Sequence, residues 1–98
     1  MSISCIIKIE SLDIYIYKHW DGNRTTMLEK LERFHEDFLE NRGWDPHYEL
    51  AQLLRHSTEL WSSTINEAFT GWGLYDSKEE IDGDYVYILK ENGNIAIK

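Results

Sequence analysis

Cysteine, proline and long apolar runs are all scarce in this chain of 98 residues, which contains one Cys and one Pro. A lone cysteine, Cys5, excludes an internal disulfide, and its neighbours Ile3, Ile6 and Ile7 favour a buried thiol. No apolar stretch approaches the roughly 20 residues of a membrane span, and the N-terminus lacks the pattern of a secretory signal. These absences predict a cytoplasmic protein without a membrane-inserted segment.

Basic residues are also scarce, because ten Lys and Arg stand against 18 Asp and Glu, for a net charge of −8. Residues 29–49 hold seven acids against three bases, and residues 76–84 hold five acids against one base. Neutralisation of phosphates supplies much of the affinity for DNA and RNA, so this balance opposes direct binding to nucleic acid. We therefore expect a protein partner with a basic surface.

The length and the 42% content of hydrophobic residues predict a single domain over residues 1–98. The pair Asn92-Gly93 is typical of a type I′ hairpin turn between the last two strands. The stretch 10–13 connects the first two strands as a hairpin. Segments rich in β-branched and aromatic residues predict strands at 3–9, 14–20, 69–75, 84–90 and 95–97.

Two helices are predicted between the strands. The first spans about 26–41, with a capping box that begins at Thr26 and with Gly43 just past its end. Asp45-Pro46 begins the second, which we expect to end near His56 or Thr58, with a further helical turn near 63–68. The apolar positions of the first helix should pack on the sheet; they are Leu28, Leu31, Phe34 and Phe38.

The order β-β-α-α-β-β-β predicts an α+β fold. We expect an antiparallel sheet of about five strands, with the two helices packed on one face. Strands grouped at the two ends of the chain and helices between them are the basis of this prediction.

The corner His19-Trp20-Asp21-Gly22 places an imidazole and a carboxylate at the end of a strand. His19 could act as a general base or metal ligand oriented by Asp21, joined by a histidine from the helices. Strand-end His and Asp residues more often cap a turn through backbone hydrogen bonds, and this is the favoured interpretation. The histidines of the helices that could join the corner are His35, His47 and His56.

Two other groups of residues are candidate sites. Asp82 and Asp84 could hold Ca²⁺ through carboxylate oxygens, but the spacing of an EF-hand loop is absent and a solvated loop is favoured. Trp44, between the helices, is the aromatic residue that we expect to be exposed at an interface. We expect no cofactor. The acidic residues predicted to bind a partner together with Trp44 are Glu29, Glu32, Glu36, Glu40, Glu79 and Glu80.

Three motifs follow one another along the chain: His19-Trp20-Asp21-Gly22, Thr70-Gly71-Trp72-Gly73, and Gly83-Asp84 with Tyr87. In this respect the chain resembles a set of small uncharacterised phage and bacterial proteins. In that set a His-(Trp/Tyr)-Asp-Gly corner ends an early strand, and a Thr-Gly-aromatic-Gly segment precedes a Gly-Asp-x-x-Tyr strand. The resemblance covers most of the chain and implies no activity. The chain departs from it at Asn23-Arg24-Thr25, where the set continues with an aromatic residue and a proline.

Three functions of different classes remain open. The first is an acidic interaction module, which the resemblance extends to an inhibitor of a nucleic-acid-binding host or defence protein in the host cytoplasm. The second is a small enzyme or metal-binding protein centred on His19 and Asp21. The third is a homodimeric structural or regulatory module. An excess of acids also keeps a small protein soluble without any partner.

Overall fold

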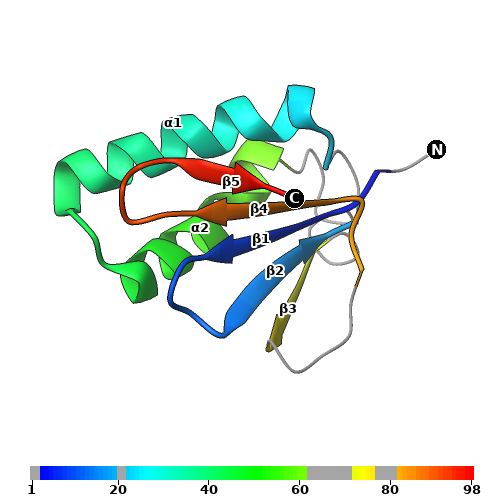
Figure 1. The fold of residues 1–98 in the computed structure, drawn as a ribbon, viewed down its shortest axis with the longest axis horizontal. Coiled ribbons are helices and arrows are strands. Elements are labelled where there is room, and N and C mark those ends of the chain that lie inside the picture. The colour runs from blue at the N-terminus through cyan, green and yellow to red at the C-terminus, as the bar shows by residue number, and fades with distance from the viewer. Residues whose placement is uncertain (1–2, 20–21, 62–71, 77–81) are drawn as a thin grey trace.

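The computed structural model describes residues 3–19, 22–61, 72–76 and 82–98, with the side chains of all of these except 26, 56–61 and 72 (Figure 1). A five-stranded sheet forms one layer, and two helices lie together behind it in the view of Figure 1. The fold is therefore α+β. Its elements are β1 (Cys5–Ile9), β2 (Ile14–Lys18), α1 (Arg24–Arg42), α2 (Pro46–Trp61), β3 (Trp72–Asp76), β4 (Tyr85–Leu89) and β5 (Ile95–Ile97).

The prediction of a purely antiparallel sheet was wrong. The strand order across the sheet is β3-β2-β1-β4-β5, and the central pair β1 and β4 runs parallel, with Ile7 beside Tyr87. The other three pairs are antiparallel. A hairpin forces neighbouring strands to run in opposite directions, but β4 follows β1 after both helices and β3. Its direction is therefore set by tertiary packing.

Helix α1 begins earlier than the capping box predicts. The carbonyl oxygen of Asn23 accepts the first helical hydrogen bond from the Met27 amide at 2.9 Å, so Asn23 is the N-cap in place of Thr26. The C-terminal prediction is confirmed, because Gly43 has a φ of +84° and its amide donates to the Leu39 carbonyl at 2.9 Å. An asparagine is as good an N-cap as a threonine, and the helix begins two residues before the predicted start.

Helix α2 begins at Pro46 as predicted, and the Asp45 carbonyl accepts from the Glu49 amide at 2.9 Å. It continues to Trp61, beyond the predicted end near His56 or Thr58. The low helix propensity of Ser and Thr costs well under roughly 1 kcal/mol per residue, which a continuing helix can offset. The helical turn predicted at 63–68 lies outside the described residues.

The hairpin of β4 and β5 uses a different turn from the predicted type I′. That turn needs positive φ at both central residues, whereas Gly93 has a φ of +92° and Asn92 is not among the described residues with positive φ. The Gly93 amide donates to the Lys90 carbonyl at 3.0 Å, and the Lys90 amide donates to the Asn94 carbonyl at 2.9 Å. The loop therefore covers residues 91–93, one residue more than a type I′ turn has between the strands, and its last residue is a glycine in the left-handed region.

The core lies between the sheet and the helices. One face of the sheet contributes Ile7, Ile16, Tyr87 and Leu89, each no more than 1% exposed, and the helices contribute Met27, Leu31 and Leu53. Of the predicted stripe of α1, Leu31 is fully buried, while Leu28, Phe34 and Phe38 are half-buried. Within the described residues, neither helix is long and apolar enough to cross a membrane.

Candidate functional site

The His19 corner is described in part. His19 is exposed at the end of β2, and its Nδ1 lies 3.1 Å from the Tyr17 hydroxyl oxygen. Trp20 and Asp21 lie outside the described residues, so the structure does not test the predicted pairing of His19 with Asp21. The contact with Tyr17 is a surface hydrogen bond along one strand.

Gly22, the last residue of this corner, has a structural reason to be glycine. Its amide donates to the Ile3 carbonyl at 2.8 Å, and its carbonyl accepts the buried Tyr87 hydroxyl at 2.8 Å. A Cβ at this position would lie 2.6 Å from the Ser4 carbonyl carbon and 2.7 Å from the Cys5 amide nitrogen. The corner therefore packs its backbone directly on the start of β1.

Burial raises the pKa of the Tyr87 hydroxyl to about 12, with smaller contributions from Cys5 and Tyr85. The Cys5 thiol is fully buried, as predicted, and burial likewise raises its pKa to about 12. Both groups are therefore neutral near pH 7. The Tyr87 hydroxyl holds the corner in place by donating to Gly22, and Cys5 fills space in the core.

The acidic residues proposed as Ca²⁺ ligands lie in different surroundings. Asp82 and Asp84 are both exposed, but one Asp84 carboxylate oxygen accepts from the Ser4 amide at 2.9 Å and from the Ser4 hydroxyl at 3.3 Å. Asp84 thus joins the start of β4 to the start of β1. Among the described residues, no three His, Cys, Asp or Glu side chains lie together in a cluster that could hold a metal ion.

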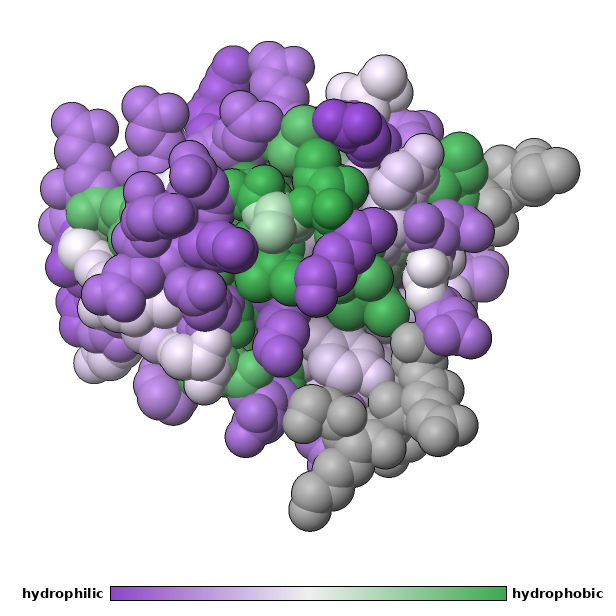
Figure 2. Space-filling view, viewed as in Figure 1, coloured by the Kyte–Doolittle hydropathy of each residue, from purple (hydrophilic) through white to green (hydrophobic). Residues whose placement is uncertain are grey.

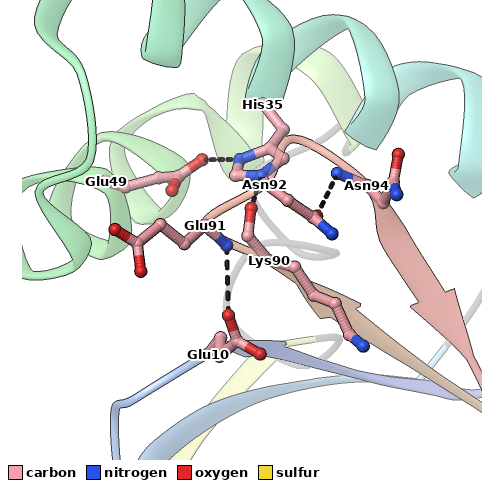
Figure 3. Close-up of polar contacts among 7 residues, drawn as sticks. All are labelled: Glu10, His35, Glu49, Lys90, Glu91, Asn92 and Asn94. Atoms are coloured by element: carbon pink, nitrogen blue, oxygen red, sulfur yellow. Dashed lines mark hydrogen bonds and ion pairs between the residues drawn. The ribbon is translucent and has the colours of Figure 1, made fainter.

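The histidines of the helices lie in contrasting environments. His47 is exposed near the start of α2, and the side chain of His56 lies outside the described residues. His35 is fully buried on α1, where it forms a close pair with the equally buried Glu49 of α2 (Figure 3). The His35 Nδ1 and the Glu49 Oε2 are 2.6 Å apart. This pair is the one cluster of buried ionisable groups that the described part of the chain forms between its helices.

The other nitrogen of His35 reaches the sheet. Its Nε2 lies 2.7 Å from the Lys90 carbonyl oxygen, which can only accept, so Nε2 carries a proton and donates. The same carbonyl accepts the Gly93 amide in the turn. The two ring nitrogens of His35 therefore join α1 to both α2 and the hairpin of β4 and β5, as Figure 3 shows.

The protonation of the pair follows from its surroundings. Burial lowers the pKa of His35, but the hydrogen bonds with Glu49 and with the Lys90 carbonyl, together with the Glu49 charge, raise it above its ordinary value. The ring is therefore protonated more readily than that of an ordinary histidine, and the protonated ring donates from both nitrogens. The second Glu49 oxygen, Oε1, is buried and has no hydrogen-bond partner in the described structure. Both nitrogens of His35 and one oxygen of Glu49 are thus hydrogen-bonded, while the other Glu49 oxygen is not.

Sequence reasoning named His35 but missed Glu49 and the pairing. The available signal was positional, because His35 lies four residues after the buried Leu31 and Glu49 lies four residues before the buried Leu53. Residues at that spacing share a helix face, so a histidine and a glutamate each occupy the apolar face of a helix. Nothing local indicates that these two faces meet. The 2.6 Å contact links residues 14 positions apart.

The predicted acidic surface is present on α1. Glu29, Glu32, Glu36 and Glu40 are all exposed, and one Glu29 oxygen lies 3.4 Å from the Arg33 guanidinium. The side chains of Glu79 and Glu80 lie outside the described residues.

Trp44, expected to be exposed, is half-buried. It packs against the core and meets the edge of His35, with ring centroids 6.4 Å apart. The interhelix turn holds it there, which limits the area that it can offer a partner.

Comparison with known proteins adds no relative. A scan of protein-family models and searches of curated proteins and solved structures found no match to this chain.

Proposed function

We propose that this protein is a small acidic interaction module, which binds the basic surface of another protein through helix α1. The phage-like resemblance suggests a specific form, an inhibitor of a nucleic-acid-binding host or defence protein in the cytoplasm. In that form the glutamates of α1 take the place of phosphates on the partner's surface.

One observation carries this proposal: four exposed glutamates line one side of α1. At about 100° per residue, Glu29, Glu32, Glu36 and Glu40 fall within an arc of roughly 80° around the helix axis. Leu31 and His35 point from the same helix into the core. The glutamate row therefore occupies the solvent side of a helix whose other side is anchored, which keeps the charges in fixed relative positions.

The energetics of the row favour a basic partner. Like charges at i, i+4 cost a helix a few tenths of a kcal/mol per pair, and Glu32, Glu36 and Glu40 are related in this way. Arg33 offsets part of the repulsion through its ion pair with Glu29, but both side chains are about three-quarters exposed and the pair contributes little. A partner's Lys and Arg side chains would relieve the remaining repulsion and accelerate association.

The experiment reverses two central charges, with Glu32→Lys and Glu36→Lys in one variant. Proteins captured from the source cells by the wild type are identified by mass spectrometry, and each purified partner is then measured by surface plasmon resonance at several salt concentrations. We expect the variant to associate at least about tenfold more slowly at low salt, and its rate to depend less on salt, because screening acts over about 8 Å at physiological ionic strength.

A matched control reverses Asp13 and Glu91, two exposed acids that lie in strand turns and outside α1, and so changes the net charge equally. The control should bind the partner like the wild type apart from a small uniform loss. Equal losses in both variants would mean that net charge alone drives binding. Unchanged association of the α1 variant at low salt would remove this helix from the function.

A further inference from the structure

The sheet has a second face, opposite the helices, which turns toward the viewer in Figures 1 and 2. The strand register places Ile6 beside Val86, and Ile88 opposite Ala96, on this helix-free face. Val86, Ile88 and Ala96 are half-buried, while Ile6 is 8% exposed. Figure 2 shows the resulting hydrophobic area over the sheet, with hydrophilic residues around it. These four residues are the apolar patch.

Three lysines belong to the same face. Lys8 lies two residues after Ile6 on β1, and Lys90 lies two residues after Ile88, just past the end of β4. Lys98 lies opposite Val86, because each of these two residues donates its amide to the other's carbonyl, at 2.9 and 3.2 Å. None of the three lysine side chains forms an ion pair within the described part of the chain. In a protein of net charge −8, this face concentrates three of the ten basic residues.

The carboxylates at the two ends of the face are already engaged with backbone amides. Glu10 accepts from the Glu91 amide at 3.1 Å, and Asp84 accepts from the Ser4 amide at 2.9 Å. Their charges are therefore partly satisfied inside the molecule, whereas the ammonium groups of the three lysines are available. The helix-free face thus combines apolar side chains with unpaired positive charge, the reverse of the acidic surface on α1.

We propose that the helix-free face is a second docking surface, and that its occupant is a protein segment that presents apolar side chains flanked by carboxylates. Apolar residues of the partner would cover Val86, Ile88 and Ala96, and its carboxylates would reach the lysines at the border. This surface is independent of α1. The protein would then hold two partners of opposite charge on its two sides.

Two other occupants, a second copy of the chain and a single-stranded nucleic acid, fit this face less well. In a two-fold dimer this same face of both copies would form the interface, so the lysines of one copy would meet a surface with the same excess of lysines, which like charge disfavours. A single-stranded nucleic acid would need aromatic rings free for stacking, but the tyrosines of this face pack on one another. The Tyr75 ring stacks on Tyr15, which is 8% exposed, at 6.2 Å and lies edge-on to Tyr17 at 6.3 Å between centroids. The excess of acids on the rest of the molecule also repels phosphates.

The test uses a library of random displayed peptides as the probe, with the purified full chain as bait. We expect the enriched peptides to combine apolar residues with Asp or Glu. Their Kd should rise at least about tenfold in a Lys8→Glu, Lys98→Glu variant and also in Ile88→Thr, and it should rise with salt for the wild type. Arg55→Glu, an exposed charge reversal on α2, should leave the Kd unchanged. Circular dichroism and melting temperature check that each variant is folded.

Lys98 is exposed, so Lys98→Glu alone remains informative if the Lys8 change weakens the fold. Three results would overturn the proposal: no peptide is enriched, the enriched peptides share basic residues, or their Kd is the same for the wild type and these variants. Lysine-dependent binding of oligothymidylate in place of peptides would assign the face to nucleic acid. If light scattering detects a dimer that Ile88→Thr abolishes, the face binds a second copy of the chain.

Discussion

Removing the imidazole of His35 tests the buried pair most directly. In His35→Ala, the Glu49 carboxylate would stay fully buried without its partner, and breaking a buried pair in this way costs roughly 3–5 kcal/mol.

The same reasoning gives a pH signature. The pKa of His35 is raised in the folded wild type, so its contribution to stability is complete below the unfolded pKa of about 6.5 and is lost as pH rises through the folded pKa. Acidification from pH 7 to pH 5 therefore increases the stability that His35 contributes to the wild type. The His35→Ala variant lacks this contribution, so its destabilisation relative to the wild type should be larger at pH 5 than at pH 7.

Urea denaturation followed by far-UV circular dichroism at pH 7 and pH 5 measures this difference. Leu31→Ala provides the matched control, because Leu31 lies one turn before His35, is fully buried and carries no charge. Its cavity should cost roughly 2–5 kcal/mol at both pH values. A His35→Ala destabilisation that is below about 1 kcal/mol at pH 7, or that changes with pH no more than the Leu31→Ala value, would refute the charged pair.

Two further predictions concern the start of β1. Gly22→Ala should lower the free energy of unfolding, measured by urea denaturation, by roughly 1–3 kcal/mol, because the new Cβ would lie 2.6 Å from the Ser4 backbone. A variant as stable as the wild type would contradict this close packing. Cys5 should react with a thiol reagent only after unfolding, because burial raises its pKa to about 12; rapid labelling of the native protein, followed by absorbance, would show instead that the thiol is accessible.

The acidic surface of α1 could be predicted from the sequence because its cause is local. Helical spacing places Glu29, Glu32, Glu36 and Glu40 together on any helix that forms here, and the apolar stripe fixes which side faces the core. The end of α1 at Gly43 and the start of α2 at Pro46 are local for the same reason. Each depends on the conformational preference of one or two residues.

The parallel pairing of β1 with β4, the buried pair and the helix-free face depend on the tertiary structure. Ile7 meets Tyr87, and His35 meets both Glu49 and the Lys90 carbonyl, in contacts between residues that are 14 to 80 positions apart. Alternation along a strand indicates that two faces exist, but not which of them the helices cover. That choice buries Ile7 and Tyr87 and leaves Lys8 and Ile88 on the other side, because side chains on a strand alternate between faces and the helices pack on the face that buries more apolar area.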